Sequence, residues 1–242
     1  MNISAVARRV AMAAALAFAT GAEAAARAEA ERKEAARKEM GEQAKGAVAK
    51  LAADMVAIPG KGYSMCRYEV TQALWEAVMG ENPSESKGAD RPVENVSWDD
   101  CQKFLEKLNA LPEVKAAGVT YRLPTADEWE FACRAGATGD YCKLADGTEI
   151  TKDTLGEVAW YVANSEIDGK KQTHPVGRKK PNAFGLYDMH GNVLEWTSSA
   201  VGRRRVLCGG SWSDYAIFCK AGYRGSIRPD CRNSRLGFRL AR

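Results

Sequence analysis

The sequence lacks the residues that a zinc site or a histidine-based active site requires. It contains only two histidines, His174 and His190, and no two of its seven cysteines form a Cys-x-x-Cys pair. Zinc sites of the usual spacing are therefore excluded. The net charge of +4 is also too small to indicate a nucleic-acid partner, so the basic residues are interpreted as a solvated surface.

The N-terminus has an apolar run that is too short to span a membrane. Arg8 and Arg9 precede this run, which covers residues 10–20, and small residues follow at 22–24. This order is typical of a secretory signal peptide, which we assign to residues 1–24. It predicts a periplasmic or secreted protein with no membrane span after cleavage. An uncleaved amphipathic helix is the alternative.

Export changes the interpretation of the cysteines. In an oxidising compartment most of them are expected to form disulfides. Seven is an odd number, so at least one cysteine has no partner within the chain.

The remaining chain divides into a spacer and one domain. Residues 25–53 are rich in alanine and in charged residues three or four apart, which predicts a solvated helix or a weak coiled coil capable of self-association. Residues 54–242 begin with two short strands, 55–58 and 63–70. Three capped helices are then expected: 72–79, one starting after Ser97, and one from the Thr125 capping box through Cys133. A long, loop-rich region follows, so the fold class is α+β.

Several motifs occur in a fixed order along the domain. They are Pro92–Trp98, Tyr121–Thr125, His174–Gly177, Asn182–Met189, Gly191–Trp196, Gly209–Trp212 and Leu236–Arg239. Together they resemble the formylglycine-generating enzyme, or sulfatase-modifying factor, family. The resemblance implies a modified C-type-lectin-like fold with little regular structure, held by calcium and disulfides.

The segment Gly191–Glu195 is the candidate calcium site. An amide and a carboxylate three residues apart, with carbonyls between them, are oxygen ligands that suit Ca²⁺. The resemblance implies side-chain ligands Asn192 and Glu195 and backbone oxygens of Gly191 and Val193. The alternative is a turn in which Glu195 accepts hydrogen bonds from backbone N–H groups.

The copper site of the family is incomplete in this sequence. Active members oxidise a substrate cysteine to formylglycine with Cu(I) held by a Cys-x-x-x-x-Cys segment after Gly-Gly-Ser. Here Asp214 stands at the first position and only Cys219 is kept. A carboxylate is a poor ligand for Cu(I), so copper is not expected and no catalytic residue is assigned. A formylglycine-generating oxidase, or a related enzyme on this fold, stays as the alternative function.

The resemblance also suggests a disulfide arrangement. Relatives with an Ala-Cys-Arg-Ala-Gly segment, present here at 132–136, often keep the cysteine at the Cys219 position. We therefore expect Cys133–Cys219 and, by similar reasoning, Cys66–Cys101 and Cys142–Cys208, with Cys231 free.

The C-terminal stretch is similar to the variable region of lectin-fold proteins diversified by retroelements. There, fixed scaffold positions alternate with varied ones. The candidate ligand-binding residues are the varied-looking positions, which mix aromatic, small and polar side chains as binding paratopes do. They are Ser213, Asp214, Tyr215, Ile217, Phe218, Tyr223, Ser226, Ile227, Asp230, Asn233 and Arg235. Alternatively, Ile217 and Phe218 belong to the core.

These features predict an exported, non-catalytic module that binds a protein or a cell-surface ligand. A third possibility is a structural envelope protein that self-associates through residues 25–53. Monomeric behaviour in solution would argue against it.

Overall fold

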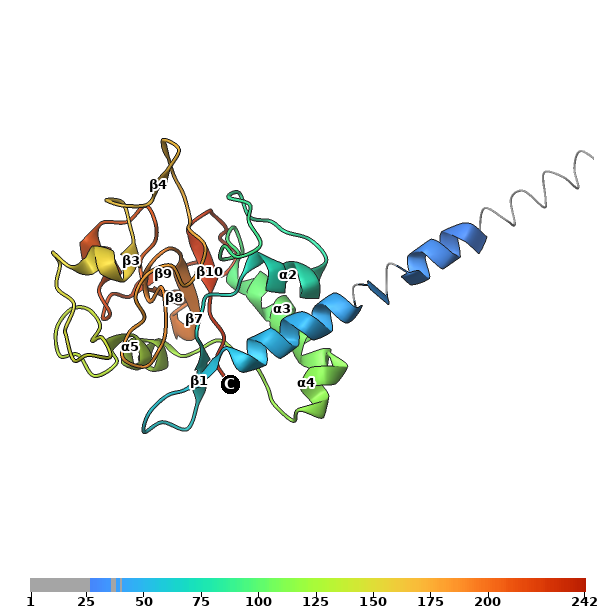
Figure 1. Cartoon of the computed structure of the whole chain (residues 1–242), viewed down its shortest axis with the longest axis horizontal. Coiled ribbons are helices and arrows are strands. Elements are labelled where there is room, and N and C mark those ends of the chain that lie inside the picture. The colour runs from blue at the N-terminus through green and yellow to red at the C-terminus, as the bar shows by residue number, and fades with distance from the viewer. Residues whose placement is uncertain (1–26, 36–37, 40) are drawn as a thin grey trace, which may run out of the picture. The chain divides into compact units, whose positions relative to one another are not determined.

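The computed structural model describes residues 27–35, 38–39 and 41–242 (Figure 1). The chain divides into two units, Met1–Gln43 and Ala44–Arg242. The predicted signal peptide, residues 1–24, lies outside the described residues. In the first unit, residues 27–35 form an exposed helix with ion pairs one turn apart, such as Arg27–Glu31 at 3.1 Å, as predicted for a solvated helix. No described helix is long and apolar enough to cross a membrane.

The larger unit begins earlier than the predicted boundary at Asp54. The helix over residues 41–53 places Ala44, Val48 and Leu51 on one face, and each is at most 6% exposed. These side chains are buried, and Val48 and Leu51 belong to the main core cluster. The last turns of the charged helix are therefore part of the domain.

The predicted helices are confirmed, and their caps explain their bounds. Thr71 caps α2 by accepting a hydrogen bond from the Leu74 N–H, and Gly80 ends this helix with a φ of 84°. Capping boxes based on Ser97 and Thr125 begin α3 and α5. The four helices of this region are α2 (Gln72–Met79), α3 (Trp98–Ala110), α4 (Pro112–Ala116) and α5 (Ala126–Arg134).

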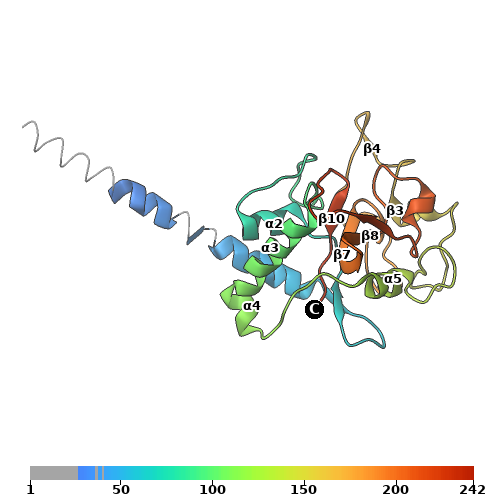
Figure 2. The ribbon, with the colours of Figure 1, turned by 180° about the vertical axis from the view of Figure 1, so that it is seen from behind.

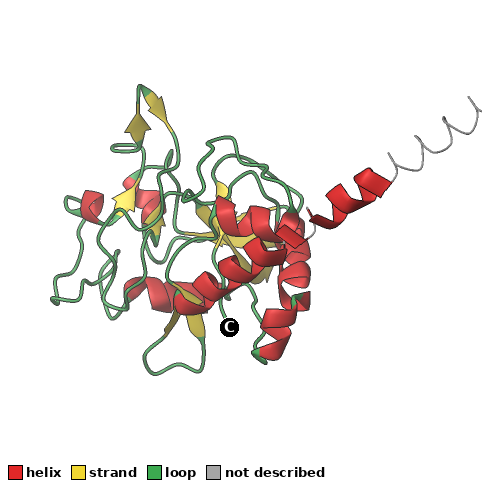
Figure 3. Ribbon diagram, turned by 45° about the vertical axis from the view of Figure 1, so that its right-hand side comes forward, coloured by secondary structure: helices red, strands yellow, loops and turns green. Residues whose placement is uncertain are grey.

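The strands are short, and most of the later chain is loop (Figure 3). The predicted first two strands pair antiparallel over β1 (Met55–Ala57) and β2 (Ser64–Cys66). The main sheet has the order β10-β7-β8-β9, with β10 parallel to β7. Figure 2 labels three of its strands, β10, β7 and β8. Its strands are β7 (Leu194–Val201), β8 (Arg204–Cys208), β9 (Gly225–Ile227) and β10 (Leu236–Phe238). Two-residue strands complete the fold: β3 (Ala159–Trp160) pairs with β6 (His190–Gly191), and β4 (Glu166–Ile167) with β5 (Lys170–Lys171).

Three apolar clusters form the core. In the largest, Trp75 stacks on Phe104 with ring centroids 5.2 Å apart, and Phe238 of β10 packs edge-on against both rings. The second surrounds Trp129 of α5. The third contains Tyr141, Leu155 and Cys219 and lies beneath the C-terminal segment that carries the candidate ligand-binding residues.

None of the three expected disulfides is present in the structure, where all seven cysteines are free thiols. Cys133 and Cys219 belong to different core clusters, and Cys66 and Cys101 share the main core without a bond. All six cysteines assigned to these pairs are buried and fill space as small apolar side chains. Only Cys231 is partly exposed, and it was the cysteine expected to be free.

Candidate ligand-binding surface

A single 3₁₀ turn, η2 (Ala216–Cys219), decides which candidate side chains face solvent. Residues three apart share a face of a 3₁₀ helix because it has three residues per turn. Ala216 and Cys219 accordingly point inward and are 9% and 0% exposed. Ile217 and Phe218 point outward and are 59% and 39% exposed, so they are not core residues.

The backbone around η2 is held firmly from below. Gly210 has a φ of 72°, and a side chain there would collide with the Cys219 Sγ, which would lie 2.6 Å from its Cβ. The Tyr141 hydroxyl donates to the Ala216 carbonyl at 3.1 Å. His190 lies between two backbone groups: its Nδ1 bonds the Cys219 carbonyl at 2.7 Å, and its Nε2 accepts from the Cys142 N–H. Burial lowers the pKa of His190 to about 4, as fits a neutral, structural ring.

The outward side chains gather into an exposed apolar surface that we call the aromatic patch: Tyr215, Ile217, Phe218 and Tyr223. Tyr215 is 68% exposed, and the Phe218 and Tyr223 rings pack edge to face at 5.3 Å. Only five large hydrophobic side chains are exposed in the described part of the chain, and three of them are in this patch. Exposed apolar side chains gathered in this way are typical of interaction sites.

A groove adjoins the aromatic patch and was not predicted from the sequence. It has a volume of about 580 Å³, and Tyr215 and Ile217 form one wall. The other wall residues include Lys152, Tyr161 and Val162, which lie far from Tyr215 in the sequence. A hydrogen bond from the Val162 N–H to the Asp214 carbonyl, 3.1 Å long, joins the two walls.

The other candidate residues divide into two groups. Asp214 accepts a hydrogen bond from the Ser211 hydroxyl at 2.6 Å and faces Arg235 at 3.7 Å, while the Asn233 side chain accepts from the Arg235 N–H. These residues adjoin the patch together with Ser213.

The second group makes different contacts. Asp230 pairs with Arg228, and Ile227 of β9 packs on the main core, with Ser226 beside it in the strand. Within the described chain, no side-chain hydrogen bond or ion pair joins these three residues to the patch side chains.

Burial differs between the candidate residues and most of the scaffold positions. None of the eleven candidate ligand-binding residues is buried. Of the fixed-looking scaffold positions, Gly209–Ser211, Ala216, Cys219 and Leu236–Leu240 are buried, whereas Trp212 and Pro229 are half-buried and Arg224 and Arg232 are exposed. The varied-looking residues therefore lie at the surface, and most but not all of the fixed-looking ones lie beneath it.

The residues at the former copper position do not fit Cu(I). Cys219 is fully buried, and burial raises the pKa of its thiol to about 12, with Asp214 adding to the shift. The thiolate that a soft metal needs is therefore disfavoured, and the Asp214 carboxylate is a hard ligand already bonded to Ser211.

The proposed calcium ligands do not fit a calcium ion in this arrangement either. Both Glu195 carboxylate oxygens accept hydrogen bonds from Arg239, and one also accepts from the Trp129 indole at 2.7 Å. The Asn192 side-chain oxygen accepts from the His174 N–H, and its amide donates to Glu69. Gly191 and Val193 are buried in the same region. In this structure Glu195 has a cation, Arg239, as its partner, and no backbone N–H of the described residues donates to it. Calcium binding by this segment stays a prediction.

Comparison with known proteins identifies the family. The sulfatase-modifying factor enzyme 1-like domain matches residues 23–242. The chain belongs to this family. One relative is the chaperone protein LppX of Paenibacillus barcinonensis, 31% identical over 73% of this chain and 78% of that protein. Another is the inactive C-alpha-formylglycine-generating enzyme 2 of Bos taurus, 32% identical over 71% of this chain; the chain spans 57% of its length.

A solved structure extends the comparison to a variable protein. Treponema denticola variable protein 1 is 34% identical and has a TM-score of 0.63, covering 74% of this chain and 84% of that one. This family member supports both the lectin-like fold and the resemblance of the C-terminus to variable lectin-fold proteins.

Proposed function

We propose that this domain is a non-catalytic binding module that recognises a protein ligand through the aromatic patch and the adjoining groove. The observation that carries the proposal is the exposure of Tyr215, Ile217 and Phe218 on a buried, rigid scaffold. A rigid backbone that presents aromatic anchors loses little conformational entropy when it binds. The signal-peptide pattern of residues 1–24 supports an exported protein, which would meet its ligand outside the cytoplasm.

The poor fit of these residues to copper supports the same proposal. Neither Asp214 nor the buried Cys219 thiol suits Cu(I), and the bovine relative is itself named as inactive. The surface that an oxidase would use for its substrate is thus free to serve as a binding surface.

Site-specific photocrosslinking tests the binding role. A benzoylphenylalanine residue in place of Ile217 should crosslink to one defined protein on the surface of cells that the source organism contacts. The same probe in place of Val201, which is 64% exposed on the β7–β8 hairpin, is the matched control and should not. Equal crosslinking from both positions would contradict the proposal.

A direct assay tests the alternative. The full chain is incubated with copper, oxygen and a cysteine-containing sulfatase peptide, and the peptide is analysed by mass spectrometry. Formation of formylglycine would refute the non-catalytic function. Sequencing around the gene is a second check: a near-copy of the last coding stretch that differs only at adenines, next to a reverse transcriptase, would establish diversification.

A further inference from the structure

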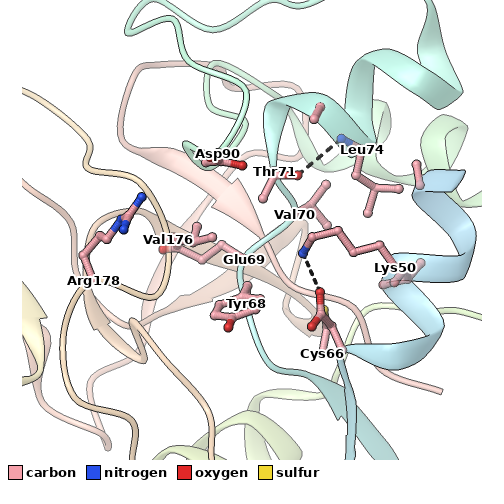
Figure 4. A pocket seen from close by; sticks show the side chains of 14 residues that line it. Lys50, Cys66, Tyr68, Glu69, Val70, Thr71, Leu74, Asp90, Val176 and Arg178 are labelled. Atoms are coloured by element: carbon pink, nitrogen blue, oxygen red, sulfur yellow. Dashed lines mark hydrogen bonds and ion pairs between the residues drawn. The ribbon is translucent and has the colours of Figure 1, made fainter. Parts of the chain in front are cut away.

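A second cavity lies elsewhere in the domain, beside the helix that ends at residue 53. Its volume is about 300 Å³, and none of the patch residues lines it. Leu51, Val70 and Leu74 supply apolar lining. Figure 4 shows Val70 and Leu74 together with the polar residues Lys50, Asp90 and Arg178. This size is at the lower end of small-molecule sites, which combine apolar walls with a few polar groups.

The rim of this cavity carries two charges of opposite sign that have no partner. Asp90 and Arg178 both line the cavity and are both exposed. Within the described residues, neither has an oppositely charged group within 4.0 Å. Lys50, on the rim as well, is different because it pairs with Asp54 at 2.8 Å. Glu69 also lines the cavity, but its carboxylate is buried and accepts hydrogen bonds from the Asn192 amide and the Val193 N–H. The cavity therefore presents one exposed anion and one exposed cation without an ion-pair partner.

Backbone hydrogen bonds hold the two loops that carry these charged residues. The Val176 N–H donates to the Asp90 carbonyl at 2.8 Å, which ties the loop of Arg178 to the loop of Asp90. The loop of Asp90 is also tied to α2, since the Ala73 N–H donates to the Ala89 carbonyl at 3.0 Å. A site whose backbone is already held in place loses little freedom when a ligand binds.

We propose that this cavity binds a free α-amino acid with an aliphatic or aromatic side chain. Arg178 binds the carboxylate, for which a guanidinium offers two parallel donors. Asp90 binds the ammonium group, and the side chain packs against Leu51, Val70 and Leu74. An α-amino acid carries one charge of each sign next to an apolar group, which is the combination that the rim and wall present. A simple anion or cation would leave one rim charge without a partner.

Isothermal titration of the full chain tests this proposal. L-leucine and L-phenylalanine should bind, and glycine should bind more weakly because it leaves the apolar wall bare. L-leucinamide lacks the carboxylate and N-acetyl-L-leucine lacks the ammonium, so each should bind roughly tenfold or more weakly than leucine. Absence of leucine binding at millimolar concentration, or equal binding of all three compounds, would overturn the proposal.

Variants assign each charge to its group. Arg178→Gln should weaken leucine binding and abolish the preference for leucine over leucinamide. Asp90→Asn should abolish the preference for leucine over N-acetyl-leucine. Arg203→Gln and Glu81→Gln remove exposed charges elsewhere and should leave leucine affinity unchanged. If these controls weaken binding as much as the rim variants do, the proposal is wrong. Serine in place of Tyr215, Ile217 and Phe218 should not affect leucine, which separates this site from the aromatic patch.

Discussion

At the scale of single residues, the buried ion pair between Arg239 and Glu195 is the strongest local constraint. The two side chains are 0% and 1% exposed and lie 2.8 Å apart. Arg239 also donates to the carbonyls of Cys66, Arg67 and Tyr187. It therefore joins its own segment to the segment at 66–67, the segment at Tyr187 and, through Glu195, to β7. We expect Arg239→Met to destabilise the domain by about 3–5 kcal/mol, because it leaves Glu195 buried without a counter-charge. Urea unfolding measures this.

An exposed ion pair is the matched control for that variant. Arg232 is half exposed where it pairs with Asp100. Arg232→Gln should cost about 1 kcal/mol or less, because water and salt screen exposed charges. Equal losses from both variants would contradict the role assigned to Arg239.

A buried carboxyl group predicts a pH effect on stability. Burial raises the pKa of Asp188 from 3.8 to about 6, and Glu195 adds repulsion that Arg239 and Lys179 partly offset. Between pH 4 and 6 the folded protein keeps a proton that the unfolded chain has released, so stability should fall as the pH rises through this range. Asp188→Asn should reduce this slope while the side-chain oxygen still accepts from the Gly177 N–H. Part of the slope should remain, because burial also raises the pKa of the neighbouring Glu69 carboxyl well above its usual value. The free energy of unfolding of both proteins is measured from pH 4 to 7. The same pH dependence in the native chain and in the variant would contradict this prediction.

The thiols give a direct chemical test. With Ellman's reagent, the native protein should react quickly at Cys231 alone, because the other six are buried. In denaturant without reductant, all seven should react. A single reactive thiol under those conditions would instead establish the three disulfides that the sequence resemblance implied.

At the scale of the element, η2 separates positions that tolerate change from positions that do not. Ile217→Ser should leave stability within about 0.5 kcal/mol of the native chain, because the side chain is solvated. Ala216→Leu should destabilise by about 1–3 kcal/mol, because Ala216 packs in the third core cluster. Thermal unfolding measures both, and a larger effect of the serine variant would refute the assigned orientation.

An element can be predicted from the sequence when the residues that determine it lie close together in the chain. The helices could be predicted because Thr71, Ser97 and Thr125 cap them within a few residues. The groove could not be predicted, because its Tyr161 and Tyr215 walls meet only through tertiary contacts. The calcium prediction depended on Glu195, and nothing near it in the sequence reveals that Arg239 is its partner.

At the scale of the whole molecule, the last turns of the charged N-terminal segment, residues 44–53, are part of the folded domain. Deleting residues 1–43 should leave the melting temperature unchanged, since the domain begins at Ala44. Deleting 1–53 should lower it strongly, because Val48 and Leu51 leave the main core. Leu51→Ala alone should cost about 2–5 kcal/mol, whereas Lys45→Ala, at an exposed position, should cost almost nothing. Identical melting of the two truncated proteins would show that the helix contributes nothing.

The parallel pairing of β10 with β7 has a consequence for biosynthesis. Phe238 and Arg239 complete the core and the buried ion pair, yet they are translated after every residue of the candidate ligand-binding surface. A frameshift or stop codon within residues 213–235 therefore also removes the strand that closes the domain. Such a product cannot fold, and proteases would degrade it. Only a chain whose reading frame stays intact through residues 213–235 therefore contains the C-terminal strand that completes the domain.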